Sequence, residues 1–361
     1  MPIERFTAKN FRCLRDIELQ TRPDFNLVYG ANASGKTSLL EALAYLGRGK
    51  SFRGAPLTSL VAHGEQEFVL FGEVREEGHV NKVGVRNSRD GLEVRVNGDS
   101  DGGSAALASA LPLQLIDPDV HNLVSGGPEQ RRRFLDWIAF HVEHGYLDTW
   151  RRFRRTLKQR NAALKSGSSR DAIRSWDVEF LGLSARIDEI RRSALELSYD
   201  TLVERGELLL GHRLDFEYQG GWAKDRSLAE VLEEGLERDR QFGATQAGPH
   251  RGELKLIYDE RQAKRLVSRG QQKLLACSMI LGATETAQAA LEKPLLLLLD
   301  DPAAELDKES LGRLMDQVVS LGSQIIATSL DPEALYFPSA PAMFHVEQGS
   351  LTQVSAGGPQ A

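Results

Sequence analysis

Cysteine is scarce in this sequence, and long apolar segments are absent. The 361 residues include only two cysteines, Cys13 and Cys277, which excludes a disulfide framework and favours a reducing, cytosolic compartment. The apolar run at 295–299 is far too short to span a bilayer, and the first residues lack the apolar core of a signal peptide. We therefore expect a soluble cytoplasmic protein without a membrane partner.

A surplus of positive charge is absent too. The chain has 45 Lys and Arg residues against 51 Asp and Glu residues, and a net charge of −6 argues against a uniformly basic nucleic-acid binder. The average hides a local excess, because residues 131–160 contain eight Arg and one Lys but only three acidic residues. Such asymmetry predicts a basic face on an acidic body.

Hydrophobic patterning predicts an α/β body interrupted by a mainly helical segment. At roughly 150 residues per domain, the length corresponds to about two domains. Helices are expected at 35–46, through most of 128–210 with a break at 166–170, and at 271–290. The Asn97-Gly98 pair predicts a tight turn. Strands are expected at 3–8, 17–20, 25–29, within 67–96, and at 111–116, 252–258, 295–299, 324–328 and 342–347.

The most specific motif lies between the expected strand at 25–29 and the helix that follows it. It matches the phosphate-loop pattern G-x-x-x-x-G-K-[ST] in full and consists of Gly30, Ala31, Asn32, Ala33, Ser34, Gly35, Lys36 and Thr37. In such a loop the backbone N–H groups surround phosphate oxygens, and the start of the helix adds positive potential. We expect Lys36 to reach the β- and γ-phosphates of ATP and the Thr37 hydroxyl to ligate Mg²⁺.

Two acidic residues follow the Leu-rich run at 295–299. A run of this kind is typical of a parallel strand at the centre of a sheet covered by helices. We expect Asp300 to provide a second contact to Mg²⁺, directly or through water, and Asp301 to orient or deprotonate the attacking water. A strand that meets an ordinary aspartate helix cap is the structural alternative.

A further motif resembles the signature of ABC-type ATPases, whose usual form is Leu-Ser-Gly-Gly-Gln. Here the segment reads Val267-Ser268-Arg269-Gly270-Gln271, with Val and Arg as departures. In that class the signature binds the γ-phosphate held by a second subunit, which implies that Ser268, Gly270 and Gln271 contact ATP in trans. A helix start of this kind suits an anion, and an ordinary Ser cap is the alternative.

Two more segments bear on the same class. Glu305-Leu306-Asp307 resembles the D-loop of ABC-type ATPases. The strand at 324–328 ends without the switch histidine that transporter ATPases carry, so Thr328 or Ser329 is expected to take that contact. The missing histidine argues against a transporter ATPase.

Over most of its length the chain resembles the RecF family, which is related to the ATPase heads of SMC proteins. Paired aspartates at 300 and 301 fit this family better than transporters, and the chain has no room for the long coiled coils of SMC proteins. The other segments that carry the resemblance are Asn10-Phe11-Arg12, the phosphate loop, residues 126–136, residues 157–162 and Gly248-Pro249-His250-Arg251.

The resemblance implies roles for two residues outside these motifs' cores. Arg12 resembles an arginine that reaches nucleotide phosphates in SMC-like heads, with a salt bridge as the alternative. Gln114 is a candidate for the lid glutamine that senses Mg²⁺ in ABC-type sites, although it lies within an apolar strand run.

The family also implies a function. It implies an ATP-dependent clamp that binds double-stranded DNA at gaps and junctions, forms a homodimer on binding ATP and hydrolyses ATP slowly with stimulation by DNA. Such a clamp would assist the RecR and RecO mediator proteins in loading recombinase during repair. ATP and Mg²⁺ are the expected cofactors.

The basic segment supplies candidate DNA contacts. Lys and Arg side chains provide most non-specific DNA affinity. A solvated helix face with internal acidic partners is the alternative. The residues assigned to a phosphate-contacting surface are Arg131, Arg132, Arg151, Arg152, Arg154 and Arg155.

The expected fold is α/β, a P-loop ABC-type ATPase lobe with a β-subdomain and an inserted, mainly helical second lobe. The expected segments are residues 1–120 for the N-terminal part of the ATPase lobe, 121–244 for the helical lobe and 245–361 for the C-terminal part of the ATPase lobe. Two other functions stay open at this point. One is a transport-type ABC ATPase subunit, and the other is a non-hydrolytic binder that structures chromosomes.

Overall fold

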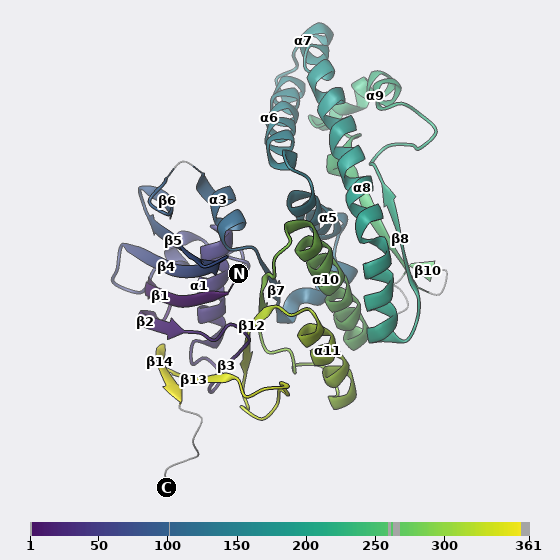
Figure 1. Cartoon of the computed structure of the whole chain (residues 1–361). Helices are drawn as coiled ribbons and strands as arrows, with labels where there is room; N and C mark the ends of the chain where they lie inside the picture. The colour runs from purple at the N-terminus through teal and green to yellow at the C-terminus, as the bar shows by residue number, and fades with distance from the viewer. Residues whose placement is uncertain (1, 101, 259–260, 263–267, 355–361) are drawn as a thin grey trace. The chain divides into compact units, whose positions relative to one another are not determined.

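The computed structural model covers most of the chain, and its elements are labelled in Figure 1. The chain forms two compact units. The first consists of residues 1–120 and 292–361, and the second of residues 121–291. The residues that the structure describes are 2–100, 102–258, 261–262 and 268–354.

A six-stranded sheet forms one half of the first unit. Its strands are β3 (Phe25–Tyr29), β7 (Leu113–Ile116), β11 (Leu296–Leu299), β12 (Gln324–Ser329), β13 (Ala342–Glu347) and β14 (Ser350–Val354). The order is β14-β13-β3-β12-β11-β7, and only β14 runs antiparallel to its neighbour. Strands β11 and β12 are buried along their whole length, as expected for parallel strands covered on both faces.

A five-stranded antiparallel sheet forms the other half and is the predicted β-subdomain. Its strands are β1 (Ile3–Phe11), β2 (Leu14–Gln20), β4 (Glu67–Glu76), β5 (His79–Ser88) and β6 (Gly91–Val96). Their order is β2-β1-β4-β5-β6. The predicted turn is present, because Asn97 and Gly98 both have positive φ and Val96 N donates to Asp99 O at 2.9 Å.

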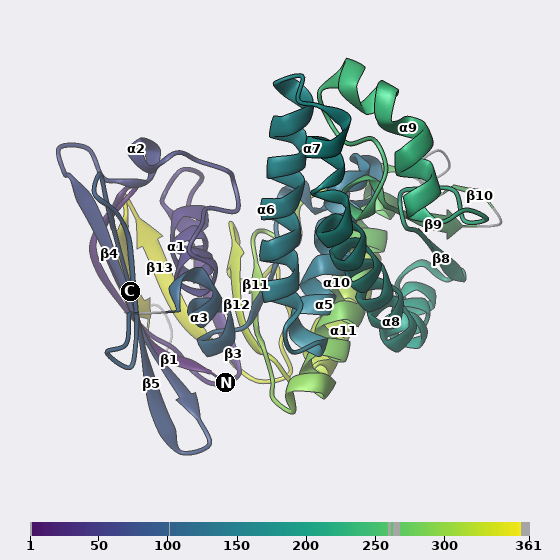
Figure 2. The same ribbon diagram turned by 90° about the horizontal axis from the view of Figure 1, so that it is seen from above.

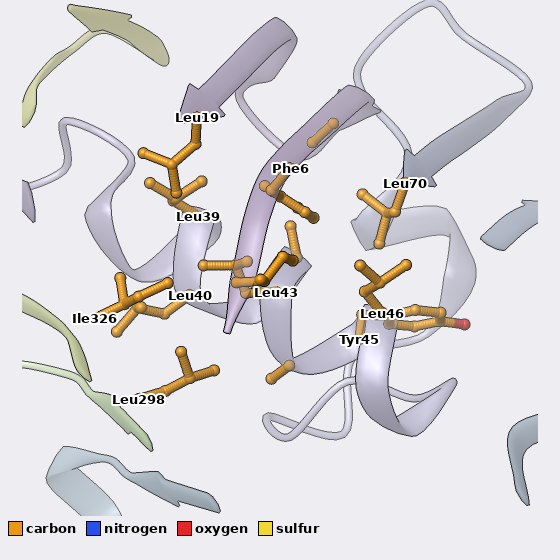
Figure 3. Close-up of a cluster of buried hydrophobic side chains, with 14 of the residues drawn as sticks. Phe6, Leu19, Leu39, Leu40, Leu43, Tyr45, Leu46, Leu70, Leu298 and Ile326 are labelled. Carbon is orange, nitrogen blue, oxygen red and sulfur yellow. The ribbon is translucent and has the colours of Figure 1, made fainter. Parts of the chain in front are cut away.

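Helix α1 (Lys36–Arg48) packs between the two sheets, as Figure 2 shows. Leucines at helical spacing on α1 are at most 1% exposed and form the centre of the core; they are Leu39, Leu40, Leu43 and Leu46. Figure 3 shows them beside side chains of both sheets, namely Phe6, Leu19, Leu70, Leu298 and Ile326. This core holds the first turn of α1 beside the ends of the parallel strands. The unit also contains α2 (Leu57–Leu60), α3 (Gly103–Ala110) and α11 (Lys308–Ser320).

The second unit is mainly helical. It contains α4 (Asn122–Ser125), α5 (Pro128–Val142), α6 (Tyr146–Lys165), α7 (Arg170–Arg174), α8 (Asp177–Leu210), α9 (Leu228–Phe242) and α10 (Arg269–Leu291). A short 3-10 turn lies at Pro249–Arg251, and another at Pro118–His121 connects the first unit to the second. Helix α8 is 34 residues long and packs against α5, α6 and α10. A small antiparallel sheet has the order β10-β9-β8 and consists of β8 (Leu214–Gln219), β9 (Glu253–Tyr258) and β10 (Arg261–Gln262).

Helix α10 is long and apolar enough to span a membrane by length and composition alone. However, 72% of its apolar window is buried inside the protein. That degree of burial is typical of a core helix in a soluble protein.

Buried arginines organise the core of the second unit. Arg160 on α6 is 0% exposed, and its guanidinium donates to Asp177 at 2.7 Å and to Asp239 at 2.8 Å. Arg191 on α8 donates to Asp136 and to the carbonyl of Pro249, at 2.8 and 2.7 Å. These charge-assisted bonds join helices to the turn at 245–252.

Most predicted strands and helices are present near their predicted positions, but α3, α11 and β14 were not expected, and the stretch 211–251 differs most. No element was expected there, whereas the structure contains β8 and α9. Helix α9 begins with a capping box, in which Ser227 and Glu230 each accept a hydrogen bond from the other's backbone N–H. The S-x-x-E spacing is a recognised helix start and was the signal that could have revealed the helix.

The compact units do not divide the chain as the lobe assignment does. The boundary after residue 120 coincides with the expected start of the helical lobe. Residues 245–291 were grouped with the ATPase lobe, yet they pack within the second unit, because β9 pairs with β8 and α10 packs against α8 and α5. The assignment of functional lobes stays a prediction.

Candidate nucleotide site

The phosphate loop connects the end of β3 to the start of α1, as the sequence predicts. Its tip, residues 31–33, is exposed. Gly35 occupies the N-cap of α1 in a left-handed conformation with φ of 118°, and Ala33 has φ of 61°, which is uncommon for a residue with a Cβ. The loop therefore curls at the N-terminus of α1, where backbone N–H groups lack intrahelical partners.

Close packing and an unpaired hydroxyl characterise this loop. A Cβ at Gly30 would lie 2.3 Å from Val346 O, and a Cβ at Gly35 would lie 3.1 Å from Cys13 Sγ. Substituents at either position would therefore displace the loop. Ser34 Oγ is buried and has no hydrogen-bond partner within the described residues. A buried polar atom without a partner indicates a place for a ligand or ordered water.

Lys36 is folded back over the loop. Its Nζ donates to Gly30 O at 2.7 Å and to Ala31 O at 2.8 Å, and the residue is 8% exposed. Burial lowers the pKa of Lys36, while the nearby charges of Asp301 and Asp300 oppose that shift. The ammonium thus contacts neutral carbonyls and lies close to two carboxylates, which suits later contact with an anionic phosphate.

Asp300 lies at the carboxyl end of β11 and faces the first turn of α1. Its Oδ1 accepts hydrogen bonds from Thr328 Oγ1 at 2.8 Å and from Thr37 Oγ1 at 3.2 Å. The residue is 4% exposed, and burial raises its pKa above the usual range. The structure therefore brings together the two residues predicted to bind Mg²⁺. Hydroxyl and carboxylate oxygens are ligands that Mg²⁺ prefers.

Asp301 follows in a strained conformation. Its φ is 48°, in the left-handed region that residues with a Cβ rarely adopt. Its backbone N donates to Thr328 Oγ1 at 2.9 Å. The side chain is half-buried at the same edge of the sheet as the phosphate loop, because β3, β12 and β11 are parallel neighbours.

Two charged residues that sequence reasoning missed lie beside Asp300. Asp117 directly follows β7, whose Ile116 O accepts a hydrogen bond from Asp300 N at 2.8 Å. Burial, aided by the charges of Asp119 and Asp300, raises the pKa of Asp117 to about 6. The signal was available, because an acidic residue follows a buried strand here just as it does at Asp300.

The other missed residue is Arg53, in the loop after α1. Its side chain is exposed, and its positive charge contributes to lowering the pKa of Asp300. Ser51 orders this loop, since its Oγ accepts from Arg53 N and Ala55 N at 3.1 and 3.2 Å. No sequence pattern that we recognised pointed to this arginine.

Arg12 makes an ion pair with α1. Its guanidinium binds both carboxylate oxygens of Glu41, with Nη2–Oε1 at 2.9 Å, and the Glu41 side chain is 0% exposed. The Ser51 hydroxyl donates to the same carboxylate. The structure thus places Arg12 in the salt bridge that was the alternative to a nucleotide contact, and the nucleotide contact stays a prediction.

Gln114 lies inside β7 and is 6% exposed. Its Oε1 accepts a long hydrogen bond of 3.4 Å from Arg48 Nη2. Burial lowers the pKa of Arg48 to about 10, and the charge of Asp117 opposes that shift. The role of Gln114 as the lid glutamine stays a prediction.

The signature-like segment belongs to the second unit and forms a capping box at the start of α10. Gln271 N donates to Ser268 Oγ at 3.3 Å, and Ser268 N donates to Gln271 Oε1 at 2.9 Å. Both side chains are exposed, and Gly270 is half-buried. Val267 lies outside the described residues. The ordinary Ser cap is therefore present, and a contact with ATP in trans is compatible with its exposure.

The D-loop-like segment precedes α11. Asp307 is the N-cap of this helix, and its carboxylate accepts from Ser310 N at 2.8 Å. Glu305 has φ of 67°, so this segment too has a left-handed residue.

The predicted DNA-contacting arginines fall into two groups. Arg131 is 7% exposed, binds Glu253 through two hydrogen bonds and donates to carbonyls of the preceding turn, so its guanidinium is not available to a DNA phosphate. Arg132 is half-buried and donates to Gly252 O at 2.7 Å; burial lowers its pKa. Arg131 therefore serves the core of the second unit, which argues against its assignment to a DNA surface, whereas the DNA contact of Arg132 stays a prediction.

The other four arginines lie on α6 and are exposed. Arg151 and Arg152 pair with Asp148 and Glu179, at 3.6 and 3.0 Å. Arg154 stacks over the Trp150 ring at 4.9 Å. Arg155 is exposed beside them. We call these four arginines, at residues 151, 152, 154 and 155, the α6 basic face. Their guanidinium groups are exposed to solvent.

The parallel sheet, the phosphate loop, the paired aspartates and the antiparallel β-subdomain define an ABC-type ATPase head. The RecF/RecN/SMC N terminal domain model matches residues 2–350. A solved structure of an SMC head bound to the C-winged helix domain of ScpA has a TM-score of 0.60 at 15% identity, covering 98% of this chain and 97% of that one, which shows the fold.

Closer relatives define the family. The DNA replication and repair protein RecF of Pseudomonas fluorescens is 39% identical over 362 residues, and the RecF of Azotobacter vinelandii is 39% identical over 363 residues; each alignment covers at least 98% of both chains. The recombination mediator protein RecF, solved with ATPrS in the RecFOR pathway, has a TM-score of 0.89 at 25% identity and 98% coverage of both chains. The chain belongs to the RecF family of DNA replication and repair proteins.

Proposed function

We propose that this protein is an ATP-dependent DNA clamp of recombinational repair, which dimerises on ATP and hydrolyses it slowly. The observation that carries the proposal is the convergence of Thr37, Asp300 and Lys36 at the carboxyl edge of the parallel sheet. Family membership supports the biological setting, since relatives of similar length are DNA replication and repair proteins.

The chain's own residues suggest how ATP would be held. On binding, the triphosphate would take the place of the two loop carbonyls as partner of Lys36 Nζ, and the exposed N–H groups at the start of α1 would face the β-phosphate. Thr37 Oγ1 and Asp300 would hold Mg²⁺, which neutralises phosphate charge. Asp301 would orient the attacking water or accept its proton.

We further propose that each ATP site is completed by a second subunit. Ser268 and Gln271 are exposed and Gly270 is half-buried at the start of a 23-residue helix, a position that suits an incoming γ-phosphate. Ser268→Arg adds bulk and charge there and leaves the phosphate loop intact. The variant should bind ATP as a monomer and fail to dimerise, which sedimentation with ATP and Mg²⁺ would show. A normal ATP-induced dimer of this variant would contradict the proposal.

The α6 basic face is the proposed DNA-contacting surface. Phosphate contacts carry no base information and weaken with salt. Arg154→Glu with Arg155→Glu should lower the affinity for double-stranded DNA about tenfold or more at every sequence and make its salt dependence shallower by about two charges. Arg170→Glu with Arg174→Glu is a matched control, because both arginines are exposed in ion pairs on α7. Equal DNA affinity of the two double variants would contradict the assignment.

Partners and compartment follow from the family. The solved RecF with ATPrS is described as a recombination mediator protein in the RecFOR pathway, so we propose that RecR and RecO are the mediator partners and that the clamp assists recombinase loading on gapped DNA in the cytoplasm. DNA is expected to stimulate ATP turnover. A pull-down of purified RecR with the ATP-bound protein, compared with the nucleotide-free protein, tests the partner assignment.

A further inference from the structure

Thr328 lies between the two aspartates that end β11. It is the fifth of six residues of β12 and is 0% exposed. The parallel pairing of β11 and β12 places Leu299 opposite Ala327, so the next residues along each strand, Asp300 and Thr328, also face each other. The backbone register therefore places the Thr328 hydroxyl next to the paired aspartates.

The Thr328 hydroxyl makes one hydrogen bond with each of these aspartates. It accepts from Asp301 N at 2.9 Å and donates to Asp300 Oδ1 at 2.8 Å. The carbonyl of Leu299 is a weaker alternative acceptor at 3.5 Å. A hydroxyl has a single proton, and the charged carboxylate is the better acceptor, so the donor and acceptor roles are fixed.

Each of these bonds restrains a group with a distinct role. Asp300 Oδ1 also accepts from Thr37 Oγ1, so two hydroxyls together set the orientation of this carboxylate. Asp301 has φ of 48°, a conformation that residues with a Cβ leave unless surrounding contacts hold them. The bond from Asp301 N to Thr328 is such a contact.

We propose that Thr328 is a positioning residue that couples the metal-binding carboxylate of Asp300 to the backbone of Asp301. The proposal rests on the function proposed above, in which Asp300 holds Mg²⁺ and Asp301 acts on water. It also changes the expectation for the position of the missing switch histidine. Because Thr328 is fully buried and its single proton is donated to Asp300, it acts on the aspartates and not on the phosphate.

The experiment compares two pairs of side chains that differ chiefly by the hydroxyl. Thr328→Val keeps the shape of threonine, and Thr328→Ser keeps the hydroxyl. Thr328→Ala against Thr328→Ser provides a second pair if the valine variant folds poorly. Thr284→Val is the control, since Thr284 is also fully buried and its hydroxyl donates to Ile280 O within α10, at 2.7 Å.

Two readouts are needed in the full-length protein. The first is the affinity for a fluorescent ATP analogue with EDTA and across an Mg²⁺ titration, which does not require turnover. The second is kcat for ATP hydrolysis with saturating Mg²⁺ and DNA. Thermal melting of each variant reports any general loss of stability.

The valine and alanine variants should bind the analogue in EDTA like the wild type, because the phosphate loop is intact. Their gain in affinity on adding Mg²⁺ should fall about fivefold or more, and kcat should fall about tenfold or more. Thr328→Ser and the Thr284→Val control should stay within about twofold of the wild type.

Two results would overturn the proposal. Valine and alanine variants with wild-type Mg²⁺ dependence and kcat would show that the hydroxyl positions nothing. A serine variant as defective as the alanine variant, with both lowered in melting temperature, would show a packing role alone. A wild-type protein whose ATP affinity does not respond to Mg²⁺ and which hydrolyses no ATP would instead refute the proposed function.

Discussion

The two units bury polar clusters of opposite kinds. In the second unit Arg160 is enclosed by Asp177 and Asp239, and each charge has a partner of opposite sign within 2.8 Å. In the first unit Lys36 donates to two neutral carbonyls, while Asp300 has only neutral donors.

This difference separates a structural cluster from a binding site. A buried charge that is paired with opposite charges stabilises one arrangement of helices. At the nucleotide edge, neighbouring carboxylates repel each other and are poorly solvated, which is why the pKa values of Asp117 and Asp300 are raised. A cation and a triphosphate would satisfy both the acids and Lys36.

The largest expected effect comes from removing the cation of the buried cluster formed by Arg160, Asp177 and Asp239. Arg160→Met keeps much of the side-chain volume but leaves Asp177 and Asp239 without their cation. We expect the free energy of unfolding of the second unit to fall by about 3–5 kcal/mol. Urea unfolding followed by circular dichroism measures it. Arg170→Met, which removes an exposed ion pair with Glu237, should change the free energy of unfolding little. Equal losses in both variants would show that the buried ion pairs contribute no more to stability than an exposed one.

The next effect concerns the charged residues at the nucleotide edge, where Lys36 lies near Asp300 and Asp301. Lys36→Met removes the cation that would contact the β- and γ-phosphates and should lower ATP turnover on the order of 1,000-fold, with a similar loss of ATP affinity. The melting temperature should not fall, because Lys36 makes no ion pair with its neighbouring acids at hydrogen-bond distance within the described residues. Calorimetric ATP titration and a thermal melt provide the two numbers. A destabilised variant with normal ATP affinity would place Lys36 among the structural charges.

Within the nucleotide edge, Asp301→Asn separates binding from hydrolysis. The amide keeps the shape and loses the carboxylate that would act on water, so turnover should fall about 100-fold while ATP affinity is retained. The ATP-bound state should accumulate. Asp307→Asn serves as a control, because Asp307 caps α11. Wild-type single-turnover rates for Asp301→Asn would assign the water-activating role elsewhere.

The smallest effect is a pH dependence of the free energy of unfolding of the second unit, which comes from His250. His250 is buried in the turn at 245–252, and its Nε2 lies 2.9 Å from Thr245 O. Burial lowers its pKa from about 6.5 to about 4. Between these values the unfolded chain binds more protons, so stability is complete above pH 6.5 and falls as the pH falls, by about 2 kcal/mol at pH 5.

His250→Gln tests this assignment, because its side-chain amide can still donate to Thr245 O but does not titrate. Its unfolding free energy between pH 7 and 5 should be flatter than that of the wild type by the amount given above. Parallel curves for the two proteins would show that His250 does not titrate differently on folding.

Local sequence patterns were enough to predict part of the nucleotide edge and of the fold around it. The phosphate loop, the buried strand ending at Asp300 and the alternating β-subdomain follow from local patterns, since glycine spacing and apolar periodicity are set by neighbours in sequence. Thr37 and Asp300 were predicted to share a metal, and the structure confirms that they are hydrogen-bonded neighbours. Their role in ATP hydrolysis stays a prediction.

Partners distant in sequence were not predictable. Arg131 reads as a surface cation within an arginine run, but Glu253, more than a hundred residues away, draws it into the core. Asp117 and Arg53 likewise acquire meaning only when the sheet and the loop after α1 bring them beside Asp300. The residue type shows the charge of a side chain. Only the tertiary structure shows whether that side chain is buried in an ion pair or exposed to solvent.

The most direct test of the account mixes two inactive variants. Lys36→Met retains Ser268, and Ser268→Arg retains Lys36, so a mixed dimer contains one ATP site with both wild-type residues. Each variant alone should stay monomeric and hydrolyse little ATP. An equimolar mixture should form dimers on ATP and recover up to about half of wild-type turnover, because neither variant pairs with itself and each mixed dimer has one of its two sites intact. A mixture no more active or dimeric than its components would contradict a site shared between subunits.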